Sequence, residues 1–446
     1  MSTIAAISTP FGSGGIAVIR ISGDEAFCIT DRFFVCQKAK CLSALSANTA
    51  VYGKVKDKDG NTVDEVVVTI FKGPHSYTGE DTVEVSCHGG ILIAKKVLRC
   101  AIEAGAEMAQ RGEFSKRAFL NGKMDLSQTE GVIDLINAVS DKGATNAVFQ
   151  MEGRLSKKIN ELRNTLLNLS AHIQALIDFP EEDLTDLSDD EVLERLEYVI
   201  KETNLLIKTA DYGKILKNGL PVAVIGKPNV GKSSLLNALS GTEKAIVTDI
   251  AGTTRDIVEE YVNINGIAIK IMDTAGIRET NDKVEAIGVE RSLKAAEDAD
   301  LILAVFDGST PLEDEDKKVL DFIKDKSHLV IVNKADKGKV VDLEGVEISA
   351  KEINGIEDLM FAMEKKIEES FVNSNTNVIT NERHVECLIK CKTNLDNALN
   401  SLNMGMPQDI ISVDLQLAIE AFGEIIGMTV SQEIVDRIFH NFCLGK

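Results

Sequence analysis

The sequence predicts a fold of the α/β plus all-α class, in which a helical domain follows an N-terminal α/β domain and is interrupted by a second α/β domain with a doubly wound mixed sheet. Two observations predict it. Short apolar runs bounded by turn residues indicate strands over 1–120 and again, separated by helical stretches, over 218–371. Apolar residues recur three and four positions apart over 121–217 and 372–446, as in amphipathic helices. A length of 446 residues suits about three domains.

The N-terminal domain is predicted from four consecutive segments. Strand-like apolar runs occur at 16–23, 63–74 and 81–90, and a segment with helical periodicity follows at 91–105. Strands followed by a helix in this order are typical of a mixed α/β domain.

The helical domain is predicted from two separate stretches of helical periodicity. The first covers about 126–178, and the second covers most of the chain after about Thr380. Because the two ends of an inserted domain often lie close together, the simplest arrangement joins both stretches in one domain, with 218–371 inserted between them.

Two features of the helical stretches could be taken for metal sites, and we favour a plainer interpretation of each. The acidic segment 181–191 is interpreted as a solvated loop in which Ser188 caps the next helix. His384, Cys387 and Cys391 would share one helix face, where buried thiols are more common than metal ligands.

Composition excludes several classes of protein. Forty-nine basic and 70 acidic residues give a formal net charge of −21, so a chain-wide basic surface is absent and contact with RNA must be local or made through a partner. A hydrophobic content of 44% with 27% charged residues is that of a globular protein. Eight cysteines without a C-x-x-C pair are typical of reduced thiols, and neither a secretory leader nor a membrane-length apolar run occurs. We therefore expect a cytoplasmic protein.

A phosphate-binding loop is predicted at 226–233, which reads GKPNVGKS. It follows the apolar run LPVAVI and precedes the helix-forming SLLNALSG, which is the context that the motif G-x-x-x-x-G-K-[ST] requires. Gly226 and Gly231 permit backbone angles that turn successive N–H groups towards phosphate oxygens at a helix N-terminus. Lys232 would then contact the β and γ phosphates, and the Ser233 hydroxyl would bind magnesium.

Further motifs follow in the order that a nucleotide-hydrolysing domain needs. The segment AGTTRD places Thr254 to complete the magnesium coordination. A hairpin with the turn Asn265-Gly266 is then predicted to lead into the DTAG segment, 273–276. There Asp273 would hold magnesium through water, and the Gly276 N–H would meet the γ phosphate.

Guanine is the predicted base. The sequence NKAD at 333–336 follows the apolar run LVIV, and SAK at 349–351 would close the site near the base. An ionised carboxylate only accepts hydrogen bonds, so Asp336 can take both the N1–H and the amine of guanine, a pair that adenine does not offer. The predicted nucleotide is therefore GTP.

The hydrolytic machinery lacks one familiar part. Signalling GTPases orient the attacking water with a glutamine near the DTAG glycine, but here Ile277, Arg278 and Glu279 follow. Another group must orient the water, and Arg255, Arg278 or a bound cation must neutralise charge on the phosphoryl group. Asn229 carries a side-chain carbonyl beside the phosphates, where a monovalent cation could bind. The alternative is that Asn229 only supports the turn.

Taken together, these segments resemble the MnmE (TrmE) family of tRNA modification GTPases. The resemblance rests on GKPNVGKSSLLNAL, IVTDIAGTTRD, DTAGIRE, the insertion of a G domain into a helical domain and the terminal FCLGK, and it covers essentially the whole chain. Many bacterial GTPases share the G-domain motifs, whereas Cys443-Leu444-Gly445-Lys446 and the N-terminal α/β domain are specific. The resemblance implies that 1–120 binds tetrahydrofolate and dimerises, and that 218–371 is a GTPase.

The resemblance also implies a reaction and its partners. A homodimer, acting with the flavoprotein MnmG, would build a carboxymethylaminomethyl-type group on C5 of the wobble uridine of certain tRNAs. A tetrahydrofolate derivative, 5-formyl or methylene, would supply the one-carbon unit, and tRNA would bind largely through the partner. GTP hydrolysis would depend on potassium and on the meeting of two G domains.

Site residues follow from the resemblance by motif. Glu285 would orient the attacking water, and Lys232 and Cys443 would also act in catalysis. Magnesium would bind Ser233 and Thr254, and potassium would bind Asn229, Thr248, Ile250 and Thr253. Folate would bind Arg20, Glu84, Lys123 and Lys446. The nucleotide and its ions would contact Asn229, Val230, Gly231, Lys232, Ser233, Ser234, Thr248, Asp249, Ile250, Ala251, Gly252, Thr253, Thr254, Asp273, Thr274, Ala275, Gly276, Asn333, Lys334, Asp336, Ser349 and Ala350.

Other readings stay open on the residues alone. The chain could be a regulatory GTPase that binds RNA, for instance in ribosome assembly, without covalent chemistry, although no lysine- and arginine-rich block occurs. It could also be a folate-dependent transfer enzyme that GTP only regulates. Each charged residue of the folate set could instead form a surface ion pair, and Glu285 could be an ordinary surface glutamate.

Overall fold

The computed structural model describes residues 2–36, 40–178, 189–242, 260–272, 296–370 and 378–446. The chain divides into two compact units, which are described separately. Unit 1 comprises Met1–Ile133, Met151–Ile159 and Gly423–Lys446, and unit 2 comprises Asp134–Gln150 and Asn160–Phe422. This division groups Gly423–Lys446 with the N-terminal domain, whereas the sequence analysis assigned 372–446 as a whole to the helical domain.

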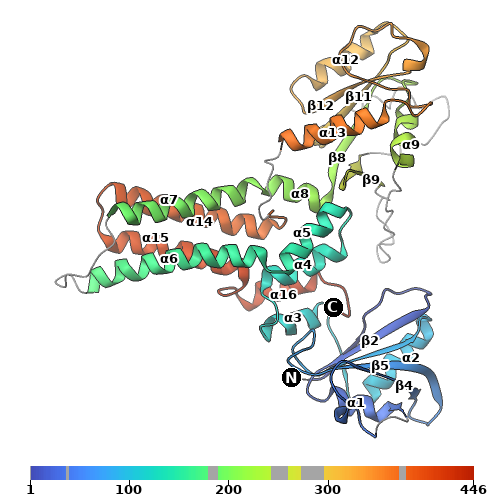
Figure 1. Cartoon of the computed structure of the whole chain (residues 1–446), viewed down its shortest axis with the longest axis vertical. Coiled ribbons are helices and arrows are strands. Elements are labelled where there is room, and N and C mark those ends of the chain that lie inside the picture. The colour runs from blue at the N-terminus through green and yellow to red at the C-terminus, as the bar shows by residue number, and fades with distance from the viewer. Residues whose placement is uncertain (1, 37–39, 179–188, 243–259, 273–295, 371–377) are drawn as a thin grey trace. The chain divides into compact units, whose positions relative to one another are not determined.

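Unit 1 contains a seven-stranded sheet in the order β3-β4-β5-β6-β2-β1-β7 (Figure 1). Its strands pair antiparallel, except that β1 and β7 are parallel. The bounds are β1 Ile4–Ile7, β2 Ile16–Ser22, β3 Phe34–Val35, β4 Thr49–Lys56, β5 Thr62–Phe71, β6 Thr82–His88 and β7 Glu107–Met108.

The two faces of this sheet differ because side chains alternate along each strand. On one face Ile19, Val68 and Val85 are fully buried in a core with helices α1 (Ala26–Phe33) and α2 (Ile91–Glu103), which Figure 1 draws beside the blue strands. On the other face Ile4 and Ala6 of β1 form a smaller cluster with Phe114, which belongs to α3 (Glu113–Leu120). The second face also carries the polar residues described below.

The C-terminal segment completes unit 1. Helix α16 (Gln432–His440) buries Val435 and Phe439 against Leu126 at the start of α4 (Leu126–Ile136). Beyond it, Leu444 forms a β-bridge with Arg111, and Ser8 Oγ donates to the Gly445 carbonyl at 3.0 Å. Gly445 has φ 91°, and a methyl group there would overlap the carbonyl oxygen of Ile7, so only glycine allows this close approach.

The helices of unit 2 outside its sheet are amphipathic and pack by their apolar stripes. On α14 the buried residues recur every three or four positions, and that helix packs along α7. The bounds are α5 Asp141–Met151, α6 Arg154–Asp178, α7 Asp189–Lys208, α8 Ala210–Asn218, α14 Glu382–Asn403 and α15 Gln408–Ile426, with α5 and α6 extending in part into unit 1. None of the described helices combines the length and apolar character that a membrane span requires.

Unit 2 also contains a six-stranded sheet in the order β13-β12-β11-β8-β10-β9. All neighbouring strands are parallel except β9 and β10, which form a hairpin. Both faces are covered: α9 and α13 pack on one and α12 on the other. The bounds are β8 Leu220–Ile225, α9 Lys232–Thr242, β9 Glu260–Ile264, β10 Ile267–Ile271, β11 Leu301–Asp307, α12 Asp314–Ile323, β12 His328–Asn333, β13 Val346–Glu347 and α13 Ile356–Ser370.

The predicted fold class is confirmed, and so are two of the expected details. The hairpin at Asn265-Gly266 is present, with both turn residues at positive φ. The stretch 126–178, predicted as long helices, consists of α4, α5 and α6. Ser140 Oγ accepts from the Gly143 N–H at the start of α5, and Gly153 at φ 77° ends it.

Candidate functional site

The phosphate-binding loop lies between the end of β8 and the start of α9. Gly226 and Gly231 both have positive φ, 151° and 100°. A methyl group at Gly226 would overlap the Val305 carbonyl oxygen, and one at Gly231 would overlap the Asn333 side-chain nitrogen. Glycine is therefore required at both positions for the loop to lie against β11 and β12, with its N–H groups available for phosphate.

Asn333 connects three segments of the site. It is the last residue of β12 and is buried. Its amide nitrogen donates to the Val230 carbonyl at 2.7 Å, and its amide oxygen accepts from the Ala350 N–H at 3.0 Å. The side chain thus holds the phosphate-binding loop and the 349–351 segment at a fixed separation, which is what a nucleotide spanning the two would need.

Lys334 ties the loop to β11. It adopts φ 65°, and its ammonium donates to the Asn229 carbonyl at 2.7 Å and to Asp307 Oδ2 at 2.6 Å. Burial alone would raise the pKa of Asp307, but hydrogen bonds from Lys334 and Ser309 outweigh it and hold that pKa below its ordinary value. Asp307 therefore stays ionised and fixes the lysine in place.

Asp336 is exposed at the same edge of the sheet. The Ser349 hydroxyl donates to Asp336 Oδ1 at 2.7 Å and lowers the pKa of that carboxyl. Asp336 is consequently a carboxylate at neutral pH, which is the acceptor-only form that guanine requires.

Lys232 and Ser233 open helix α9 at the end of the loop. The Lys232 ammonium donates to the carbonyls of Gly226 and Lys227, at 2.8 and 2.9 Å, so it lies over the loop itself. Ser233 is exposed at the first turn of the helix. The glycine-built loop, this lysine and this hydroxyl fit a nucleotide triphosphate with its magnesium ion.

Two charged residues of this site were missed by the sequence analysis. Asp307 ends β11 beside the ends of β8 and β12, and the rule that parallel strands present their carboxyl ends at one edge could have found it. Lys227 lies inside the motif but bonds away from the loop, to Asp316 at 2.9 Å and Glu313 at 3.1 Å on α12. Burial opposes its charge, but these two carboxylates prevail and raise the pKa of Lys227.

Part of the predicted nucleotide site lies outside the described residues. This applies to the segment 248–254, which holds the predicted potassium and magnesium ligands Thr248, Ile250, Thr253 and Thr254. It applies equally to the DTAG segment, 273–276, and to Glu285. Their roles stay predictions.

Unit 1 contains a second polar site on the sheet face opposite α1 and α2. Arg20 of β2 and Glu84 of β6 are directly opposite in the antiparallel register. Arg20 Nε and NH2 both donate to Glu84 Oε1, at 2.9 and 2.8 Å. The side chains are 12% and 27% exposed, so this ion pair is largely buried. Most ion pairs between such residues lie on the surface, exposed to water.

Aromatic rings flank the Arg20 guanidinium. Its carbon lies 5.0 Å from the centre of the Tyr77 ring and 5.6 Å from that of Phe114, both within cation–π range. The Tyr77 hydroxyl and Ser115 Oγ are 2.8 Å apart. Arg20 NH1 is buried and has no hydrogen-bond partner among the described residues. A buried guanidinium N–H without an acceptor is costly, so this donor is available to a water molecule or to a ligand acceptor.

The C-terminal residues reach the same place. Lys446 is half-buried, and burial together with the nearby Arg20 charge lowers its pKa, against the opposing effect of Glu84. We call Arg20, Glu84, Tyr77, Phe114 and Lys446 the Arg20 pocket. Sequence motifs had suggested three of its members, while Tyr77 and Phe114 carried no signal in the sequence that marked them.

Two other predicted residues of unit 1 stand apart from the pocket. Lys123 donates to the Pro74 carbonyl at 2.9 Å and forms no hydrogen bond or ion pair with Arg20 or Glu84. Cys443 is an exposed free thiol, and its carbonyl accepts from the Gly112 N–H at 3.4 Å. In unit 2, His384, Cys387 and Cys391 do share a face of α14, and all three are buried.

Family models match almost the whole chain. The model described as the MnmE helical domain matches residues 126–443. The model described as the GTP-binding protein TrmE N-terminus matches residues 3–123.

Two curated proteins are similar over the whole chain, and a solved structure is similar over part of it. A protein named tRNA modification GTPase MnmE from Geobacillus kaustophilus is 46% identical over 461 residues, covering 100% of this chain and 99% of that protein. A protein of the same name from Clostridioides difficile is 44% identical over 455 residues, with the same coverage. Among solved structures, an Era variant from Aquifex aeolicus bound to GDP and AlF4− is 29% identical, covering 39% of this chain and 66% of that one with a TM-score of 0.25.

Proposed function

Because the chain belongs to the MnmE (TrmE) family of tRNA modification GTPases, we propose that its GTP turnover serves the building of a carboxymethylaminomethyl-type group on C5 of the wobble uridine of tRNA. The chain is a GTP-hydrolysing enzyme of tRNA modification. Its phosphate-binding loop with Lys232 and Ser233 suits GTP bound together with Mg²⁺.

The unpartnered Arg20 NH1 beside Glu84 is the observation that carries the one-carbon part of the proposal. When bound, a tetrahydrofolate derivative supplies a one-carbon unit. Glu84 can accept from the amide-and-amine edge of its pterin, and Arg20 NH1 can donate to one of its acceptor atoms. Lys446 adds positive charge for the carboxylates of the folate, and Lys123 has the same role from a different position.

Potassium and dimerisation belong to the G domain in this proposal. The Asn229 side chain is exposed, while its backbone carbonyl is fixed by Lys334, so the side-chain oxygen is free to bind a cation beside the phosphates. We assign potassium to Asn229 with Thr248, Ile250 and Thr253, magnesium to Ser233 and Thr254, and the orientation of the attacking water to Glu285. Two copies of the chain would bring their G domains together for hydrolysis.

The proposed partners are the flavoprotein MnmG and tRNA in the cytoplasm. A net charge of −21 opposes direct binding of the tRNA phosphates over most of this surface, which favours a partner that supplies the basic contacts. The Arg20 pocket favours covalent chemistry over a purely regulatory RNA-binding GTPase. A regulatory GTPase would not need a second site with a buried guanidinium N–H that lacks an acceptor.

The decisive experiment is nucleoside analysis of tRNA from cells that lack this protein and are complemented with variants. Wild type should restore the wobble-uridine modification, and Glu84→Gln should not, although the purified Glu84→Gln protein should hydrolyse GTP normally. Glu103→Gln, which breaks an exposed ion pair on α2, is the matched control and should restore the modification. If cells lacking the protein keep the modification, the proposal fails.

Potassium is tested separately. GTP hydrolysis by the full chain should fall strongly when potassium is replaced by sodium, because the smaller ion fits the same oxygen ligands poorly. Equal rates in the two salts would remove potassium from the proposal and leave the tRNA chemistry untouched.

A further inference from the structure

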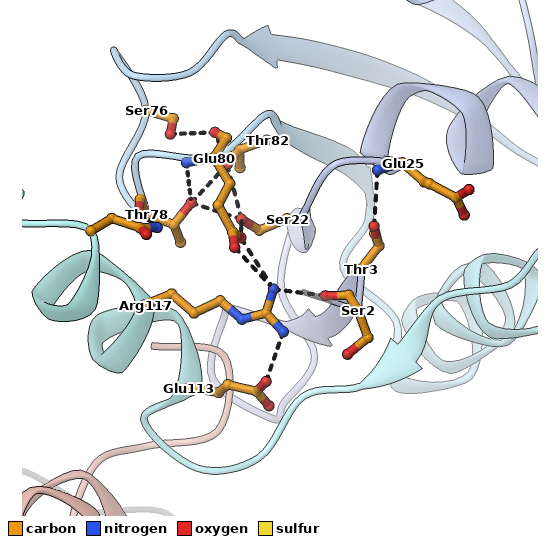
Figure 2. Close-up of polar contacts among 11 residues, drawn as sticks. Ser2, Thr3, Ser22, Glu25, Ser76, Thr78, Glu80, Thr82, Glu113 and Arg117 are labelled. Carbon is orange, nitrogen blue, oxygen red and sulfur yellow. Dashed lines mark hydrogen bonds and ion pairs between the residues drawn. The ribbon is translucent and has the colours of Figure 1, made fainter. Parts of the chain in front are cut away.

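We propose that a buried ion-pair network around Arg117 is a positioning device for the Arg20 pocket, and that it sets the affinity of the pocket for the pterin end of folate. This inference rests on the proposed folate-binding function. The Arg117 network consists of Arg117, Glu80, Glu113, Ser22 and Thr78, and Figure 2 shows it.

Arg117 is the centre of the network. Its side chain is only 5% exposed. NH1 donates to the Ser2 carbonyl at 2.7 Å and lies 3.2 Å from each carboxylate oxygen of Glu80, and NH2 donates to Glu113 Oε1 at 2.9 Å. One guanidinium thus joins the N-terminal segment, the 73–82 segment and helix α3. A fork of fixed geometry among three acceptors defines their mutual positions more tightly than a lysine could.

Glu80 extends the network to strand β2. Ser22 Oγ donates to Glu80 Oε2 at 2.8 Å, and the hydroxyls of Ser22 and Thr78 are 2.7 Å apart. The Glu80 N–H donates to Thr78 Oγ1 at 3.2 Å, which folds the 73–82 segment onto itself. Ser22 and Thr78 are fully buried, so water does not compete for these bonds.

Three members of the Arg20 pocket, namely Arg20, Tyr77 and Phe114, are near neighbours of network residues in the chain. Ser22 follows Arg20 by two positions on β2, and side chains two apart on a strand point to the same face. Thr78 directly follows Tyr77, and Figure 2 shows it directed at Ser22.

On α3, Glu113 directly precedes Phe114, and Arg117 follows Phe114 by three positions, one turn along the helix. The network therefore joins the three elements that carry Arg20, Tyr77 and Phe114. Direct hydrogen bonds add to this connection, since Tyr77 pairs with Ser115 and the Asn121 side chain donates to the Thr78 carbonyl.

The spacing of the pocket walls is therefore set by the Arg117 network, whose residues do not touch the ligand. Affinity for a flat, hydrogen-bonding ring depends on wall positions to within about half an ångström. Weakening the Arg117 network should therefore lower the affinity for folate without removing any group that touches folate. At metal sites, the loss of such supporting contacts lowers affinity by roughly ten- to a hundredfold.

The test measures affinity of the full chain for 5-formyltetrahydrofolate by calorimetry, together with melting temperature and GTP hydrolysis. Glu80→Gln keeps the size and most hydrogen bonds of the side chain but removes its charge. Arg117 itself is not the residue to change, because its loss would leave Glu80 and Glu113 buried without a cation. Glu80→Gln should raise the dissociation constant for folate about tenfold or more and leave GTP hydrolysis unchanged.

Two further variants serve as a control and as a second test. Glu103→Gln makes the same chemical change on the surface of the same domain and should bind folate like the wild type. Ser22→Ala removes one hydroxyl from the network but leaves the ion pairs, and it should weaken binding a few-fold even if Glu80→Gln proves too unstable to purify. Wild-type affinity in both Glu80→Gln and Ser22→Ala would overturn the inference, while leaving the folate proposal in place. If the wild type itself binds no folate, both fail.

A spectroscopic signal gives a readout without ligand. The chain has no tryptophan, so Tyr77→Trp introduces a single indole in the pocket wall. With Glu80→Gln in the same chain, its emission should shift to the red relative to the chain with Glu103→Gln, because the wall opens to water. Identical spectra in the two backgrounds would contradict a positioning role.

Discussion

Guanine selection at Asp336 depends on a carboxylate that one serine keeps ionised. The Ser349 hydroxyl both fixes Oδ1 and lowers the pKa of Asp336, and Ser349 itself is buried. A carboxylate only accepts hydrogen bonds, so it cannot pair with a base that presents an acceptor at the same position. Discrimination between bases therefore depends on hydrogen-bond donors and acceptors rather than on shape.

Asp336→Asn should therefore exchange one base preference for another. An amide offers a donor as well as an acceptor, which suits the C2 carbonyl of xanthine and leaves the guanine amine without its partner. We expect affinity for GTP to fall by about a hundredfold or more and affinity for XTP to rise, as measured by nucleotide titration. Asp325→Asn, an exposed aspartate on the same domain, is the control. GTP affinity unchanged in Asp336→Asn would refute the assignment of the base.

The lowered pKa of Lys446 predicts a pH dependence. Burial and Arg20 make Lys446 lose its proton at lower pH than an ordinary lysine, and the neutral amine no longer attracts the carboxylates of folate. Folate affinity of the wild type should thus weaken several-fold between about pH 7 and about pH 10, whereas Lys446→Arg, which stays charged, should change little over that range. Parallel pH profiles for the two proteins would show that Lys446 does not contribute.

At the scale of residues, the sequence anticipated groups that belong to contiguous motifs and missed those that the fold assembles. Asn333, Lys334 and Asp336 could be named because their spacing is local. Arg117 could not, because it acts on residues that are distant in the chain and reach it only through the fold. Asp307 also pairs with a distant residue, and only the rule that parallel strands end at one edge of the sheet could have pointed to it.

The loop between β8 and α9 shows how an element can depend on the lack of a side chain. Positive φ at Gly231 and the closeness of Asn333 both exclude a Cβ atom there. Asn333 would have to leave the Val230 carbonyl, and the loop would lose its brace to the base-binding segment.

Gly231→Ala should accordingly raise the dissociation constant for GTP by at least about a hundredfold. The strain of about 1 kcal/mol from positive φ adds to the steric overlap with Asn333. Gly241→Ala is the matched control on α9, where no described atom lies within 4 Å of the added methyl. It should bind GTP normally and stabilise the helix by about 0.5–1 kcal/mol. Fluorescent-nucleotide titration and thermal unfolding measure the two effects, and equal affinities in both variants would contradict the loop geometry.

Elements with strong periodicity and clear turn residues could be predicted, and those that end through tertiary contacts could not. The β9–β10 hairpin followed from two strand-like runs joined by Asn265-Gly266. The break between α5 and α6 depends in addition on Gln128, whose side-chain amide donates to the Met151 carbonyl at 2.8 Å and satisfies the helix end. No periodicity in the sequence reports that bond.

At the scale of the molecule, unit 1 and unit 2 have separate hydrophobic cores, so they should unfold in separate transitions. Ile19→Ala in the first core and Leu303→Ala in the second should each cost about 2–5 kcal/mol, but in different transitions. In calorimetry, GTP should raise the midpoint temperature of only the transition that Leu303→Ala lowers. Folate should raise the midpoint temperature of only the transition that Ile19→Ala lowers. A single transition that both substitutions and both ligands shift equally would refute this independence.

The assignment of Gly423–Lys446 to unit 1 is the aspect of the whole molecule that the sequence did not indicate. Helical periodicity locates α16 but cannot tell which core receives Val435 and Phe439. The choice is made by close packing with Leu126 and by the hydrogen bond from Ser8 to Gly445, and neither has a local signature.

That bond joins residues 437 positions apart in the chain, and this distance has a meaning for biosynthesis. At about 5–20 residues per second, a ribosome that has released the first strand needs roughly 20–90 s to deliver the segment that closes over it. Both neighbours of β1 in the sheet, β2 and β7, lie within the first 108 residues, so the sheet can pair early, whereas Ser8 has no Gly445 carbonyl and the Arg20 pocket has no Lys446 until that segment is made.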